Sequence, residues 1–399
     1  MSAYLLDWFS LLARWAHIVT GIAWIGSSFY FVWLDNHLLP PERPDGEPGV
    51  AGELWAVHGG GFYRARKYAV APQFLPRTLH WFYWEAYSTW ITGMLLLSAL
   101  YFAQADAYLV DPSVLALSRP AAIGVALAFI TGSWLLYDGA CRSPLGRRPK
   151  ALAATVTLLV AVLAFGLCHA FGGRGAFIVY GACLGTIMVA NVFFVIIPGQ
   201  RELVQAKQQG RDPDPQPGLR GKQRSVHNTY FTLPVLFVMI SNHYAMTWGG
   251  AGNWMVLLAL SFAGASLRAW FVIRHKAEWR ERSTASLPLV ASLVTLALVA
   301  AVLRPVSQLQ ADMVVPDAAQ VQAIVVERCT PCHTHQPTVA GFNAPPNGIV
   351  LESVEQMRAH LPEVRKQLAL HAMPLGNLTH MTDVERAQLL LWAGAGGAT

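Results

Sequence analysis

The chain has 399 residues, of which 54% are hydrophobic and only 13% charged, against roughly 25% charged in soluble domains. This deficit of charge excludes an ordinary soluble protein and indicates a membrane protein. The formal net charge of +6 does not indicate binding to nucleic acid, because the basic residues are confined to particular loops.

Eight apolar stretches are long enough, or nearly so, to cross a hydrocarbon core about 30 Å thick. They lie near residues 11–34, 81–102, 121–137, 151–171, 177–197, 230–248, 254–273 and 285–303. The third stretch is the shortest. We therefore predict an all-α protein in which residues 1–303 form an eight-helix transmembrane bundle.

Lysine and arginine alternate sharply between successive loops of this bundle. The rich loops hold 19 of these residues, in 35–80, 138–150, 199–229 and 274–284. The poor loops hold 2, in 103–119, 172–175 and 249–253. Because loops rich in Lys and Arg stay in the cytoplasm, we predict a multi-pass protein of the bacterial inner membrane with both termini in the periplasm.

Ionisable side chains inside a bilayer are costly, so each of them is a candidate for function. The predicted topology puts His17, His169 and His243 toward the periplasmic ends of their helices, and His80 and His227 toward the cytoplasmic ends. Facing imidazoles in two such layers could hold haem b; ordinary hydrogen bonding between helices is the alternative. His227 and His243 lie roughly 160° apart around one helix, which disfavours two stacked haems on it.

Residues 304–317 are predicted to be a linker to a second domain, residues 318–399. This second domain contains Cys-Thr-Pro-Cys-His, the motif that attaches haem c covalently, here through Cys329 and Cys332 with His333 as an iron ligand. Met373 is the predicted second axial ligand, since a thioether opposite histidine is the usual cytochrome c pairing. The weaker rivals are Met357, Met381 and His371.

A zinc site is the alternative interpretation of the same motif. His335 is close, but no further cysteine follows, so haem c is favoured. Residues 321–328 predict a helix that ends at the motif, and the run from Thr382 to Glu385 is a capping box that opens a last helix. Covalent haem is attached in the periplasm of bacteria, so the motif independently supports the orientation predicted from the loops.

Three segments together carry a resemblance to a known family. The first helix contains Arg-Trp-Ala-His at 14–17 and Gly-Ile-Ala-Trp-Ile-Gly-Ser-Ser-Phe-Tyr at 21–30, and the second begins His-Trp-Phe-Tyr-Trp-Glu at 80–85. The tail adds the haem motif and Met-Pro-Leu-Gly-Asn at 373–377. The chain resembles the membrane-bound urate oxidases (urate hydroxylases) of the PuuD family, in which a urate oxidase N-terminal membrane domain is fused to a cytochrome c domain.

The resemblance implies oxidation of urate to 5-hydroxyisourate in purine catabolism. Electrons would pass to the fused c-type haem and then to a respiratory-chain acceptor, a soluble cytochrome c or a terminal oxidase, and not directly to O2. The family supplies no catalytic residues for this chain. A base is required for the proton of the attacking water, and His17, His80 and Glu85 are the candidates. Trp24 or Phe82 is expected to stack on the purine, in the periplasmic half of the bundle.

Two other classes of function compete with this enzyme. In the first, the chain is a haem-bearing electron-transfer subunit of a membrane dehydrogenase. It would then have no substrate site of its own, and urate would not reduce its haem. A transporter with the cytochrome as a redox sensor would need a continuous polar path, which two layers of histidine do not provide.

Overall fold

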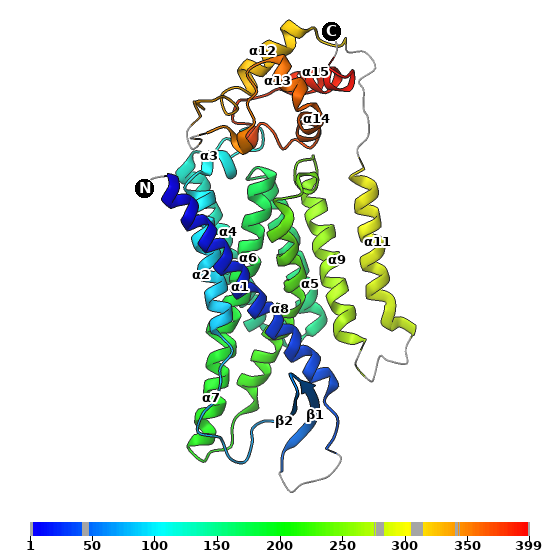
Figure 1. Ribbon diagram of the computed structural model, residues 1–399. Coiled ribbons are helices and arrows are strands. Elements are labelled where there is room, and N and C mark those ends of the chain that lie inside the picture. Colours follow the sequence, from blue (N-terminus) through cyan, green and yellow to red (C-terminus); the bar gives the residue numbers. More distant parts are fainter. Residues whose placement is uncertain are drawn as a thin grey trace.

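The computed structural model describes residues 3–41, 48–274, 276, 283–304, 314–339, 342 and 344–397. Most of these residues are helical, and they form a long bundle with a smaller helical unit at one end (Figure 1). The bundle and the smaller unit have separate hydrophobic cores.

Within the described residues, six helical segments are long and apolar enough to cross a membrane. They are formed by α1 (Ala3–His37), α4 (Arg119–Arg142), α5 (Pro149–Cys168), α6 (Gly173–Asn191) with α7 (Ile197–Gln208), α9 (Asn253–Ile273) and α11 (Leu287–Val302). The other two predicted spans coincide with α2 (Trp84–Leu96), extended by a π turn to Phe102, and with α8 (Pro215–Ser241). Membrane-length helices are thus confirmed, and the count of eight spans stays a prediction.

Most side chains of α6 are buried, which shows that this helix lies at the centre of the bundle. A Cβ on Gly181 would lie 2.8 Å from a methyl of Val238, so glycine is what lets α6 and α8 approach this closely. A π turn, Val192–Ile196, joins α6 to α7. Short helices connect the long ones: α3 (Ala105–Tyr108) and the turns Pro144–Arg147, Ala245–Thr247 and Ser283–Ser286.

A two-stranded antiparallel sheet between α1 and α2 departs from the predicted all-α fold. Strands β1 (Val50–His58) and β2 (Gly61–Tyr68) are joined by Gly59 and Gly60, which have φ of 56° and 81°. Two successive residues with positive φ match the type I′ turn that closes tight hairpins, and glycine adopts it without strain. Figure 1 shows this hairpin at the end of the bundle opposite the C-terminal unit, which is also where the loop between α7 and α8 lies.

The C-terminal unit consists of α12 (Ala318–Arg328), α13 (Val354–Ala359), α14 (Leu361–Ala369) and α15 (Asp383–Gly394), with short turns at Pro346–Gly348 and Leu375–Asn377. The predicted helix before the haem motif and the capping box at Thr382 are both confirmed. Helices α12 and α15 are joined by Arg328, whose Nη2 donates to Glu385 at 2.9 Å. Trp392 and Leu389 of α15 are fully buried in the same core.

The loop after α14 rests directly on the bundle. Ala372 is part of the buried core of the bundle, and Leu370 packs against that core. Two glycines make the approach possible: a Cβ on Gly249 would lie 1.8 Å from the carbonyl oxygen of Leu370, and a Cβ on Gly376 would lie 2.9 Å from that of Ala107. The segment that contains Met373 is therefore the segment that docks.

Candidate functional site

The haem motif forms a compact turn at the end of α12. The backbone N–H groups of Cys332 and His333 both donate to the carbonyl oxygen of Cys329, at 3.2 and 3.0 Å. Nδ1 of His333 lies 2.9 Å from the carbonyl oxygen of Ile349. Because a carbonyl only accepts, Nδ1 carries the proton and Nε2 is left unprotonated, as a nitrogen that could bind a metal ion.

Burial raises the pKa of the Cys329 thiol to about 12, and burial also raises the pKa of Cys332. Burial therefore favours the neutral form of both thiols. In the described part of the chain, no group of three or more His, Cys, Asp or Glu side chains is placed to hold a metal ion.

Arg386 connects Met373 to the haem motif. Its Nη1 donates to the carbonyl oxygens of Met373, at 2.7 Å, and Leu368, at 3.1 Å, and its charge acts on the thiol of Cys329. The rival methionines Met357 and Met381 are at most 4% exposed and belong to the hydrophobic core of the unit. Met373 is half-buried and lies outside that core.

The residues of this unit fit haem c. Two thiols and one oriented imidazole follow α12, and a methionine is held by an arginine that also neighbours one of the thiols. The buried indole Nε1 of Trp392 has no hydrogen-bond acceptor among the described residues. An orphaned buried donor is uncommon, and a polar edge of a bound prosthetic group would satisfy it.

The five histidines of the predicted layers occupy separate settings. His17 lies against α2, with Nδ1 3.0 Å from both the carbonyl oxygen of Thr89 and the hydroxyl of Thr92. His169 lies at the end of α5, and its side chain contacts the same helix: Nδ1 is 2.7 Å from the carbonyl oxygen of Phe165. His243 is exposed beyond the end of α8.

His227 belongs to a buried polar network between α4, α6 and α8. Its Nδ1 lies 2.7 Å from the hydroxyl of Tyr137, which accepts from Asn191 at 3.1 Å. Asn191 also donates to Asn228 at 2.8 Å. Nothing in the sequence indicated that Asn191 would meet Tyr137 and Asn228.

The network reaches the hairpin end of the bundle through an ion pair. Arg224 is 4% exposed and donates to Asp138 at 2.7 Å. Asp138 also accepts from Arg142 at 2.6 Å, and their spacing of four residues puts both on one face of the helix.

Two further intramembrane charges have unsatisfied atoms. Oε2 of Glu85 is buried without a partner among the described residues, and so are Nε and Nη2 of Arg268. Arg268 is only 4% exposed, and its Cζ lies 3.7 Å from the centre of the Phe29 ring. Helix α1 therefore covers Arg268.

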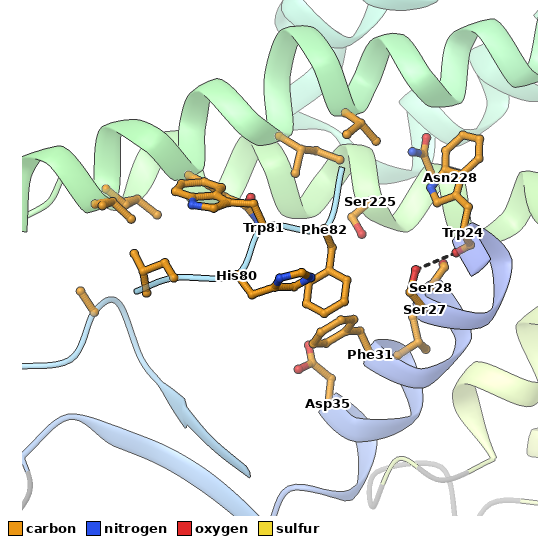
Figure 2. Close-up of a pocket in the computed structure, with 18 of the residues that line it drawn as sticks. Trp24, Ser27, Ser28, Phe31, Asp35, His80, Trp81, Phe82, Ser225 and Asn228 are labelled. Carbon is orange, nitrogen blue, oxygen red and sulfur yellow. Dashed lines mark hydrogen bonds between the residues drawn. The ribbon is translucent and has the colours of Figure 1, made fainter. Parts of the chain in front are cut away.

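A cavity of about 670 Å³ opens between α1, the segment before α2, and helices α7 and α8. Trp24, His80 and Phe82, which the sequence had singled out, line it together. Figure 2 shows His80, Phe82 and Phe31 gathered on one side and Trp24 with Asn228 on the other. His17 and Glu85 are not among its lining residues.

Comparison with known proteins agrees with this architecture. A family model described as urate oxidase N-terminal matches residues 3–303, which is the bundle. No curated protein and no solved structure matches the chain.

Proposed function

Because the chain belongs to the urate oxidase N-terminal family, we propose that it oxidises urate to 5-hydroxyisourate and passes the electrons to haem c bound at Cys329 and Cys332. The family suggests oxidation of urate, and the haem motif suggests where the electrons go. The observation that carries the connection is the docked loop: Ala372, beside Met373, is buried in the core of the family domain, and Leu370 packs against that core.

The reaction consumes one urate and one water and releases 5-hydroxyisourate, two electrons and two protons. Haem c, when bound, would supply a one-electron acceptor, so two successive transfers are needed for each urate. His333 would hold the iron through Nε2 and Met373 through its sulfur. Arg386 fixes the backbone of Met373, and its buried charge is compensated by two carbonyl oxygens.

The proposed reaction does not involve haem b. The Nδ1 of His17 is anchored and its Nε2 is free, as in an iron ligand. However, no contact among the described residues joins the side chain of His17 to a second histidine. An additional b-type band in the visible spectrum would require two histidines to face each other as haem ligands, and the described contacts contain no such pair.

The location and partners follow from the same proposal. The membrane is the bacterial inner membrane, with the haem-bearing unit in the periplasm, where it would deliver electrons to a soluble cytochrome c or a terminal oxidase. The arrangement supports this, since the Lys- and Arg-rich hairpin lies at the opposite end of the bundle (Figure 1).

The test is an anaerobic visible spectrum of the purified, oxidised protein before and after urate is added. We expect urate alone to produce the reduced c-type α band, and mass spectrometry to detect the product. A double variant, Cys329→Ser with Cys332→Ser, serves as the control without covalent haem. A haem that dithionite reduces and urate leaves oxidised would instead identify an electron-transfer subunit.

A further inference from the structure

We propose that the cavity between α1, residues 70–82 and helices α7 and α8 is the binding site for the purine substrate, with the ring of Phe82 as its stacking platform. This inference rests on the proposed function for the identity of the ligand. The position of the proposed site in the molecule comes from the structure.

The size and walls of the cavity suit a planar heterocycle. Ligand pockets span roughly 300–1,000 Å³ and combine apolar walls with a few polar groups, and this cavity has about 670 Å³. Phe82 meets the rings of Phe31 and His80 edge to face, at 4.9 and 4.7 Å between centroids. Phe82 is nevertheless 49% exposed. Its neighbours thus fix the orientation of the ring and leave it accessible to a ligand.

The backbone of the cavity wall supplies hydrogen-bond donors. Residues 79–82 line the cavity and lie in non-helical chain. No described hydrogen bond uses their backbone N–H groups. The carbonyl oxygens of a purine such as urate are suitable acceptors for these N–H groups.

The side chains add charge and polar contacts. Urate is an anion at neutral pH, and Lys207 lines the cavity without a partner among the described residues. The acidic wall residue Asp35 is paired with Lys67 at 2.6 Å. Asn228 also lines the cavity, and the contacts of its amide to Asn191 and to the carbonyl oxygen of Met188 fix its orientation. The adjoining π turn, Val192–Ile196, is a feature frequent at functional sites.

The experiment measures binding without turnover, by equilibrium binding of radiolabelled urate to the full-length, dithionite-reduced protein in detergent. Phe82→Leu keeps bulk and removes the flat ring, and Ser28→Met fills the cavity from α1. Because Phe82→Leu removes the stacking surface, we expect it to raise Kd about tenfold. Ser28→Met takes up space that the ligand would occupy, so we expect it to raise Kd as well. The matched control is Phe262→Leu, on an exposed face of α9, which should bind within about twofold of wild type.

The outcomes test the proposed binding site separately from the proposed electron transfer. A rise in Kd in both cavity variants, with the c-type haem content and the control unchanged, supports the site. Binding by both variants with the affinity of the control would overturn it. Binding by wild type without reduction of the oxidised haem would overturn the proposed electron transfer and leave the site standing. Absence of binding by wild type would overturn both.

Discussion

At the scale of single residues, the C-terminal unit contains two proposed iron ligands whose described polar contacts leave the ligating atom free. The contact between His333 and Ile349 selects the tautomer that exposes Nε2. Arg386 holds the backbone of Met373 at 2.7 Å and leaves the side chain of that methionine uncommitted. Both proposed iron ligands are therefore oriented by neighbours through bonds that do not involve the ligating atoms.

The role of Met373 is tested by Met373→His. Imidazole in place of a thioether lowers the reduction potential, so we expect a decrease on the order of 0.1 V, within the roughly 0.8 V range that axial ligands span. Redox titration of the c-type band measures it. Met381→Leu is the control, since a volume-conserving change in the core should leave the potential unchanged. An effect of Met381→Leu alone would reassign the axial ligand.

At the scale of elements, the crossing of α12 and α15 depends on one charged pair. Burial acts to raise the pKa of Glu385, but hydrogen bonds from Arg328 and Thr382 outweigh it, so the pKa lies below its ordinary value. A carboxyl with a depressed pKa stabilises the fold above its unfolded pKa of about 4.3. That stabilisation is lost as the pH falls through the folded pKa.

We expect Glu385→Gln to destabilise the C-terminal unit by about 1–2 kcal/mol at neutral pH, since the Arg328 contact loses its charge. The difference from wild type should shrink as the pH falls below about 4. Urea unfolding followed at the haem band measures both effects. Glu363→Gln, at an exposed site on α14, is the control. A difference that persists at low pH would show that the charge of Glu385 is not responsible.

At the scale of the whole molecule, two sites lie at opposite ends of one bundle. The cavity lies toward the hairpin end, and the haem motif belongs to the unit at the other end (Figure 1). About 20 residues of α1 lie between its first residue, Ala3, and Trp24 in the cavity wall, which is a length on the order of 30 Å. The proposed electron transfer would have to cross this length. The ring pair Tyr101 and Tyr108, 5.6 Å between centroids, lies in the part of the bundle that meets the docked loop.

Docking is tested by a pair of neighbouring glycines. Gly249→Ala would place a methyl 1.8 Å from the carbonyl oxygen of Leu370 and displace the docked loop, whereas Gly250→Ala would meet no atom within 4 Å. We expect the first variant to slow reduction of the haem by urate at least about tenfold and the second to leave it unchanged. Stopped-flow absorbance gives the rates, with reduction by dithionite as the control for haem integrity. Equal rates in the two variants would contradict a role for the docked loop.

The position of the cavity also predicts the side from which substrate enters. We had expected the periplasmic half of the bundle, and the cavity instead favours the hairpin side, which the loop charges assign to the cytoplasm. In sealed membrane vesicles, urate added outside should reduce haem c faster in inside-out than in right-side-out preparations. Faster reduction in right-side-out vesicles would place the substrate site at the other end.

The sequence by itself determined the features that depend on local pattern. Apolar length predicted the membrane helices, and the capping box at Thr382 predicted the start of α15. The haem motif predicted two thiols and an imidazole together, because five consecutive residues cannot separate in space. The Gly-Gly pair between β1 and β2 is a sequence signal for a hairpin, but the predicted all-α fold did not include one.

Only the tertiary structure decided which distant residues meet. Trp24 and Phe82 lie on different segments, and their common cavity depends on how α1 packs against the chain before α2. Tyr137, Asn191 and Asn228 form one network for the same reason. The histidines showed the limit of position as a guide: depth along a helix predicted layers, but the direction of each side chain depends on rotation and packing. Those contacts are set by side-chain fit between helices, which no spacing along one chain records.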